Sequence, residues 1–187
     1  ADTETAPRAR RSQPVARNAA ARAEAGPGTH DGAGRHAVFL NLATSVARKH
    51  ATRVLVIGAR PAPPPVATRL GLAPSPALHE LLHRGLPTPL AIHRTRVAGL
   101  SVVVSGYGEG NGGPTDRDRL ARLLAQLRGR FDWVLIDAPV WSDGGIGVWA
   151  ELCDGSFLVL RQPDSDHPDV EAAHELLHRD GKLKGYL

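Results

Sequence analysis

The stretch Phe131 to Pro139, FDWVLIDAP, decides the fold. Trp133 to Ile136 are consecutive apolar residues without polar alternation, which is typical of a strand covered on both faces in a parallel sheet. Asp137 follows at the carboxyl end of this predicted strand, the end at which open α/β sheets bind ligands. An Asp in this place is typical of the Walker B carboxylate that helps to hold Mg²⁺ on a nucleotide, and the alternative is an Asp that caps the following turn.

Composition limits the class of protein. The chain has 187 residues, of which 42% are hydrophobic, and this suits one α/β domain with its own core. A net charge of +4 permits weak attraction to phosphates or acidic membranes, but only 4% of the residues are aromatic, so we expect no specific nucleic-acid partner. The single cysteine, Cys153, excludes an internal disulfide and predicts a reducing, cytoplasmic compartment. No apolar stretch approaches the roughly 18 residues of a membrane span.

The N-terminal part of the chain divides into an arm and a loop. Residues 1–27 are rich in Arg, Ala and Pro without apolar periodicity, which predicts a basic, disordered arm. Gly26 to Gly34 is a glycine-rich loop, and the apolar spacing from Arg35 to His50 predicts a helix directly after it. A glycine loop that opens a helix favours phosphate, because free backbone N–H groups and the helix dipole both attract anions.

The remaining segments alternate between apolar runs and amphipathic stretches, with a polar connection from about residue 84 to residue 99. Further strands are predicted at Arg53–Ile57, Leu100–Ser105, Ser156–Leu160 and Lys182–Leu187, and further helices at Val66–Leu70, Ala77–His83, Thr115–Arg130, Gly144–Leu152 and Asp169–Arg179. This alternation predicts an α/β fold with a doubly wound, mainly parallel sheet in three layers. The chain contains no methionine, so we expect a fragment or processed product whose last strand is cut short.

Two other patterns offer alternative sites. Gly108 to Gly113, GEGNGG, matches G-x-G-x-x-G between a predicted strand and a predicted helix, which would indicate a dinucleotide-binding unit with Asp137 on the ribose. A flexible glycine connection explains the same residues. His79 with His83, and His174 with His178, are i, i+4 pairs that could each bind a metal, although solvated helix histidines explain them equally simply.

The order of six stretches carries a family resemblance. They are THDGAGRH (Thr29–His36), RVLVIGAR (Arg53–Arg60), ALHELLHRG (Ala77–Gly85), GLSVVVSG (Gly99–Gly106), FDWVLIDAPV (Phe131–Val140) and CDGSFLVLR (Cys153–Arg161). In this order they resemble the P-loop ATPase domain of the bacterial tyrosine kinases of capsule and exopolysaccharide export, which are relatives of the MinD and ParA ATPases. The resemblance implies a P-loop NTPase-like domain over residues 28–187, truncated at its C-terminal end.

The departures from this family concern the residues that handle Mg²⁺ and phosphate. The family's P-loop ends in Gly-Lys-Ser/Thr, with the Lys on the phosphates and the hydroxyl on Mg²⁺. Those places hold Gly34, Arg35 and His36 in this chain. Arg35 keeps the positive charge in a bulkier, forked group, and His36 offers an imidazole where Mg²⁺ prefers oxygen. The family's second acidic motif would fall at Gly58 and Arg60, neither of which is a carboxylate.

The resemblance and its departures together imply a pseudokinase, a degenerate P-loop domain that regulates or scaffolds exopolysaccharide synthesis or export. Its expected partner is a protein of the export assembly or a second copy, with peripheral membrane association through a membrane protein at the inner face. The alternatives are an active ATP-dependent tyrosine kinase, with Arg35 replacing Lys, and a MinD- or ParA-like positioning ATPase. If ATP or ADP binds with Mg²⁺, the resemblance implies that Asp137 is the catalytic and metal residue. The phosphate would then lie on Gly32, Ala33, Gly34, Arg35 and His36.

Overall fold

The computed structural model describes residues 33–50, 52–59, 67, 70–106, 116–138, 146–159, 168–179 and 181–186. The elements in chain order are α1 (Ala33–His50), β1 (Val54–Gly58), α3 (Leu78–His83), the 3₁₀ helix η1 (Thr88–Ala91), β2 (His93–Arg94), β3 (Leu100–Val103), α4 (Arg117–Arg128), β4 (Trp133–Asp137), α5 (Ile146–Leu152), β5 (Ser156–Leu158), α6 (Pro168–Arg179) and β6 (Leu183–Tyr186). These elements confirm the predicted alternation of strands and helices. The basic arm of residues 1–27, most of the helix predicted at Val66–Leu70 and the loop Gly108–Gly113 lie outside the described residues.

Strand β1 lies at the centre of a sheet with the order β2-β3-β1-β4. It runs parallel to β3 on one side and to β4 on the other, and only the short β2 runs antiparallel. Strands β5 and β6 form a separate parallel pair. Every residue of β1 is buried, because helices cover both faces of the sheet. The predicted doubly wound, mainly parallel α/β fold is thus confirmed.

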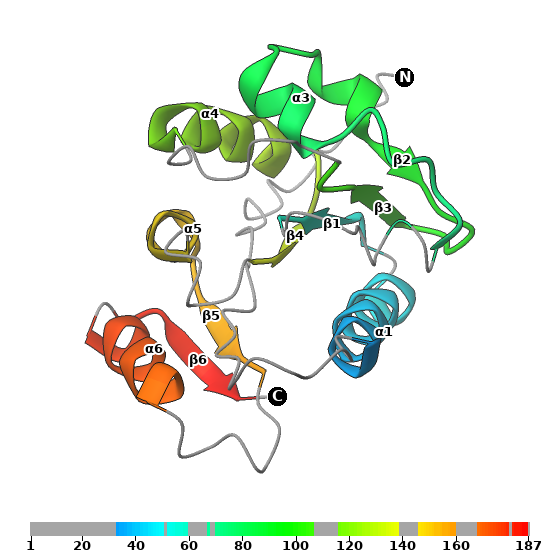
Figure 1. Ribbon diagram of the computed structural model, residues 1–187. Helices are drawn as coiled ribbons and strands as arrows, with labels where there is room; N and C mark the ends of the chain where they lie inside the picture. The colour runs from blue at the N-terminus through cyan, green and yellow to red at the C-terminus, as the bar shows by residue number, and fades with distance from the viewer. Residues whose placement is uncertain are drawn as a thin grey trace, which may run out of the picture.

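Helices cover the two faces of the strands unequally. In Figure 1, α3, α4, α5 and α6 lie along one side of the strands, and α1 lies on the other. Successive residues of β1 alternate between these sides, as the pleat of a strand requires. Leu55 and Ile57 pack with the leucines of α4, whereas Val54 and Val56 pack with Phe39 and the small residues of α1. The core therefore consists of two apolar layers separated by the sheet.

Helix α4 forms because its leucines recur at helical spacing and its first turn is capped. Leu120, Leu123, Leu124 and Leu127 form one buried stripe that faces the sheet. The Asp116 carboxylate accepts hydrogen bonds from the backbone N–H groups of Asp118 at 3.0 Å and Arg119 at 3.1 Å. The helix predicted to start at Thr115 thus begins at Arg117, with Asp116 as its N-cap.

The structure differs from the sequence prediction between residues 84 and 105. The predicted polar connection contains η1 and β2, whose His93 and Arg94 pair with Val102 and Ser101 of β3. Strand β3 ends at Val103, earlier than predicted. The reason is that the Val104 carbonyl accepts a hydrogen bond from Leu78 N at 2.7 Å and so joins the start of α3. In the part of the chain that the structure describes, no helix has the length and apolar character to cross a membrane.

Candidate functional site at the carboxyl edge of the sheet

The carboxyl ends of β1, β3 and β4 meet at one edge of the sheet, here called the carboxyl edge. Asp137 is the last residue of β4 and lies opposite Gly58, the last residue of β1. The backbone N–H of Ala59 donates to the Asp137 carbonyl at 3.0 Å, which holds the two strand ends together. The chain continues from β1 to β3 on one side of β1 and later returns to β4 on the other side. Such a reversal of strand order is where open α/β sheets bind ligands.

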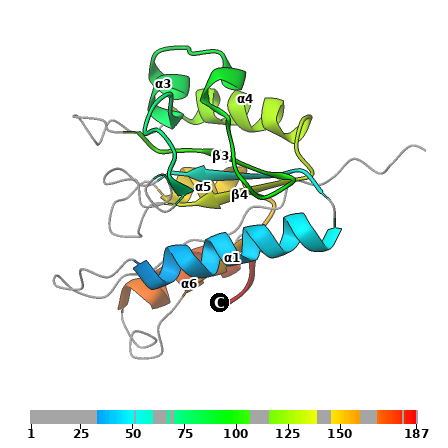
Figure 2. The same ribbon diagram turned by 90° about the vertical axis from the view of Figure 1, so that its right-hand side faces the viewer.

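Helix α1 places its N-terminus at the carboxyl edge. The helix runs antiparallel to β1, so its first turn lies near the ends of β1 and β4 (Figure 2). Ala33, Gly34, Arg35 and His36 form this first turn, and Gly32 lies outside the described residues. The first N–H groups of a helix have no partner within the helix and carry the positive end of its dipole. The backbone of this turn thus has N–H groups of the kind that bind a phosphate, and the phosphate site expected here stays a prediction.

The N-terminus of α4 reaches the same edge but is already occupied. The Asp116 carboxylate takes two of its free N–H groups. The hydrogen bond from the Arg119 backbone N–H, together with that from Asp118, holds the pKa of Asp116 below its usual range. An incoming anion would have to displace a carboxylate that is ionised at neutral pH. The N-terminus of α4 is therefore a poor anion site.

Gly58 determines how many carboxylates the paired ends of β1 and β4 offer to a metal. A Cβ at Gly58 would lie 3.6 Å from Ser105 N and 3.8 Å from the Val103 carbonyl, which are ordinary contact distances. Packing therefore does not demand glycine here, and a carboxylate at this position would stand beside Asp137. Ser105 is a neighbour at this edge that the sequence analysis did not include among the candidate site residues. Its place as the last residue of the predicted strand Leu100–Ser105 was the signal that it would lie at this edge.

The described residues suit an anion better than they suit Mg²⁺. Mg²⁺ prefers oxygen ligands in octahedral geometry, taken from one or two carboxylates, phosphates and water. Within the described ranges, no group of three or more His, Cys, Asp or Glu side chains is placed to hold a metal. At the carboxyl edge, Asp137 is half-buried and offers the carboxylate, while Gly58 offers none. The first turn of α1 provides backbone N–H groups for a phosphate, and of the paired residues Gly58 and Asp137 only Asp137 provides a carboxylate for a metal.

The two histidine pairs do lie on single helix faces. The ring centroids of His79 and His83 are 4.7 Å apart, and those of His174 and His178 are 5.4 Å apart. Both pairs belong to the sequence His-Glu-Leu-Leu-His, whose spacing is that of zinc peptidases. The Glu80 carboxylate of the first pair instead accepts hydrogen bonds from the Ser75 hydroxyl at 3.0 Å and from Ala77 N at 3.1 Å. Within the ranges that the structure describes, neither pair is joined by a third side chain placed to hold a metal.

The dinucleotide alternative is not favoured by the strand order. In a dinucleotide-binding unit, the strand that carries the glycine loop is the neighbour of the strand that carries the acidic residue. Here β1 lies between β3, which precedes Gly108 to Gly113, and β4, which ends in Asp137. Two strand spacings, about 10 Å, therefore separate the two strands.

Cys153 is buried and belongs to the core. Its carbonyl accepts a hydrogen bond from Lys182 Nζ at 2.5 Å, which links the start of β5 to the start of β6.

The sequence matches no protein-family model, and no curated protein is significantly similar to it. Several solved structures are similar. The BceF tyrosine kinase domain is 27% identical, with a TM-score of 0.70 over 91% of this chain and 67% of that chain. The kinase domain of the Escherichia coli tyrosine kinase ETK is 19% identical, with a TM-score of 0.75 over 94% of this chain and 67% of that chain.

The cell-division protein MinD is similar to the same degree. The Pyrococcus horikoshii protein, whose structure contains Mg-ADP, is 19% identical, with a TM-score of 0.73 over 92% of this chain and 69% of that chain. In both groups the similarity extends over more than nine-tenths of this chain. The chain therefore has the P-loop NTPase-like α/β fold of bacterial tyrosine kinase domains and MinD ATPases.

Proposed function

We propose that this chain is a degenerate P-loop tyrosine-kinase-like domain, a pseudokinase that regulates or scaffolds exopolysaccharide synthesis or export. The observation that carries this proposal is the pairing of Gly58 with Asp137. Asp137 stands at the end of β4, where the tyrosine kinases have their metal-orienting Asp, but glycine stands at the neighbouring strand end, where they have a carboxylate. Catalysis of phosphoryl transfer depends on protein groups that hold the phosphates and Mg²⁺ in position, and on cations that neutralise the negative charge of the phosphates. The loss of one of these protein groups therefore removes much of the catalysis.

The first turn of α1 supports the same proposal. Arg35 and His36 occupy the places of the phosphate-binding Lys and the Mg²⁺-binding hydroxyl. A guanidinium is planar and presents a fork of donors, so it does not replace the compact charge of an ammonium. The backbone of this turn still provides N–H groups, so weak binding of a phosphate without Mg²⁺ is compatible with the proposal.

The retained fold then serves as a binding partner. The domain docks to a protein of the polysaccharide-export assembly or to a second copy, and it reaches the inner face of the membrane through a membrane protein.

A phosphorylation assay tests this function. The full chain is incubated with ATP and Mg²⁺, and phosphotyrosine on Tyr107 and Tyr186, the only two tyrosines, is measured together with ADP release. We expect neither product, and we expect Asp137→Asn to behave as the wild type does. Phosphotyrosine that disappears in Asp137→Asn would instead establish an active tyrosine kinase. ADP release without phosphotyrosine would support the positioning ATPase.

A further inference from the structure

The edge of the sheet opposite the candidate site, where the parallel strands begin, is rich in exposed cations. We call it the amino edge. Within the described residues, five of its basic side chains are exposed and form no ion pair: Arg48, Lys49, Arg94, Arg96 and Arg130. The acidic residues beside them are already paired. Asp132 binds Arg53 at 3.0 Å, and Asp154 binds Arg128 at 3.2 Å. The amino edge therefore carries an uncompensated positive charge.

The loops that carry these cations are in contact with one another. Val54 N donates to the Gly99 carbonyl at 2.8 Å, which joins the end of α1 and the start of β1 to the turn that contains Arg96. Asp132 N donates to the Arg53 carbonyl at 2.8 Å, which joins the start of β1 to the turn that contains Arg130. The cations thus belong to one continuous surface across the starts of β3, β1 and β4.

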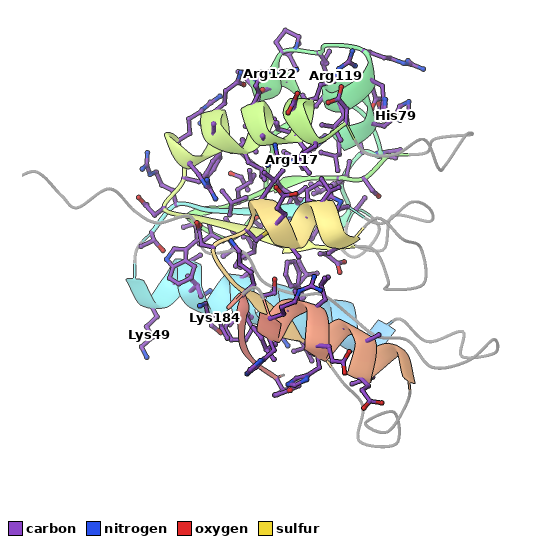
Figure 3. The ribbon with its side chains drawn as sticks, turned by 90° about the vertical axis from the view of Figure 1, so that its left-hand side faces the viewer. Lys49, His79, Arg117, Arg119, Arg122 and Lys184 are labelled. Carbon is purple, nitrogen blue, oxygen red and sulfur yellow. The ribbon has the colours of Figure 1, made fainter. Side chains whose placement is uncertain are left out.

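Helix stability explains only part of this pattern. A cation at the C-terminus of a helix is favourable, and this accounts for Arg48 and Lys49 at the end of α1. Arg94 and Arg96 have no such explanation, because they lie in β2 and in the turn after it. The cations and the carboxylates of the candidate site lie on different sides of the molecule. In Figure 3, Lys49 of the amino edge, together with Lys184, lies on the side away from His79 and Arg119. Asp116 and Asp137 lie at the carboxyl edge.

We propose that the amino edge lies on an anionic lipid surface and turns the carboxyl edge away from the membrane. This proposal rests on the proposed function in one respect, the location of the domain at the inner face of a membrane. The strands are about 4.8 Å apart, so cations spread over several strand starts form a broad face rather than a groove for one peptide. Helix α1 and helix α4 turn their C-termini to this face, so they offer no N–H cradle for an individual phosphate. A diffuse cluster of this size is typical of attraction to acidic headgroups.

Binding to vesicles tests the proposal. The full chain is sedimented with vesicles rich in phosphatidylglycerol, with phosphatidylcholine vesicles as the neutral comparison. The edge variant is Lys49→Gln with Arg96→Gln. Its matched control is Arg84→Gln with Arg122→Gln, which removes the same charge from exposed positions on the α3 and α4 side that form no salt bridge within the described residues. Residues 1–32 are present in both variants, so any contribution from them cancels.

We expect binding only to the acidic vesicles, weakened at least about tenfold in the edge variant, changed less than about twofold in the control, and lost in high salt. Equal weakening of the two variants would overturn the proposal, because net charge alone would then explain it. A preference for duplex DNA, with vesicle binding unchanged in the edge variant, would also overturn it. These outcomes do not depend on the phosphorylation assay, so either proposal can fail while the other stands.

Discussion

Gly58 and Asp137 show how a single residue decides the chemistry of an otherwise intact fold. They stand side by side at the ends of β1 and β4, yet 79 positions separate them in the chain. The sequence predicted each of them at a strand end, because each follows an uninterrupted apolar run. It did not predict their pairing, because the order of strands in a sheet depends on tertiary packing and not on local pattern. The candidate site was thus predictable residue by residue, but not as an arrangement.

Position 99, unlike position 58, requires glycine. Gly99 has a φ of +81°, and a Cβ there would lie 2.6 Å from the Thr52 carbonyl oxygen. We predict that Gly99→Ala lowers the free energy of unfolding by about 2 kcal/mol or more, because it combines an unfavourable backbone conformation with a clash against backbone. The measurement is urea denaturation, with a lower midpoint and an unchanged slope.

Gly71→Ala is the matched control for this prediction. Gly71 also has a positive φ, +62°, but nothing lies within 4 Å of the Cβ position. It should cost only the conformational penalty, about 1 kcal/mol. Equal effects of the two substitutions would show that the contact with Thr52 does not restrict residue 99.

At the scale of elements, α3 illustrates what holds a short helix in place. Its six residues are too few for a stable isolated helix, so it depends on its N-terminus and on the buried Leu78 and Leu82. The Glu80 side chain accepts hydrogen bonds from Ser75 and Ala77 and so fixes the start of the helix. Burial raises the pKa of Glu80, but the hydrogen bonds from the Glu80 backbone, Ser75 and Ala77 outweigh it and hold the pKa below its ordinary value of 4.5.

This lowered pKa predicts how the stability depends on pH. The folded carboxyl stays ionised to a lower pH than the unfolded one, so its stabilising contribution is complete above about pH 4.5 and is lost as the pH falls through the folded pKa. We predict that Glu80→Gln lowers the free energy of unfolding by about 0.5–1 kcal/mol at neutral pH, since solvent reduces the effect of a partly exposed group. The same substitution should reduce the loss of stability on acidification.

Glu175→Gln is the control, because Glu175 occupies the same His-Glu-Leu-Leu-His sequence within α6 but is exposed and, among the described residues, caps nothing. Urea denaturation at several pH values compares the two. Identical pH profiles for the wild type and Glu80→Gln would contradict the role given to Glu80.

The elements that the sequence predicted are those with strong periodicity. Strands β1 and β4 follow continuous apolar runs, and α4 follows a leucine stripe, so their positions were right to within about two residues. Strand β2 was missed because its two polar residues carry no pattern, and it exists only through its pairing with β3. Such a strand forms only through contacts between residues that are distant in sequence, so no local sequence pattern predicts it.

At the scale of the whole molecule, the parallel arrangement separates two kinds of surface. The strand ends gather Asp137 and the N-termini of α1 and α4, and the strand starts gather the helix C-termini with their cations. The doubly wound fold was predictable from the alternation of elements, since few topologies satisfy it. The charge separation was not, because the residues that produce it are scattered from Arg48 to Arg130.

The most direct test of the pseudokinase is a calorimetric titration of ATP, with and without Mg²⁺, into the wild type and into the triple variant Arg35→Lys, His36→Thr, Gly58→Asp. The variant introduces the lysine, the hydroxyl and the second carboxylate, and a Cβ at position 58 would meet its neighbours only at ordinary contact distances. A second variant with Gly58→Asn in place of Gly58→Asp controls for the substitution itself.

We predict no Mg²⁺-dependent binding to the wild type and a gain of Mg²⁺-dependent binding in the triple variant that the Asn control lacks. Micromolar, Mg²⁺-dependent binding to the wild type, equivalent to about 8 kcal/mol and abolished by Asp137→Asn, would contradict the account, because Asp137 would then form a working site without a second carboxylate at position 58.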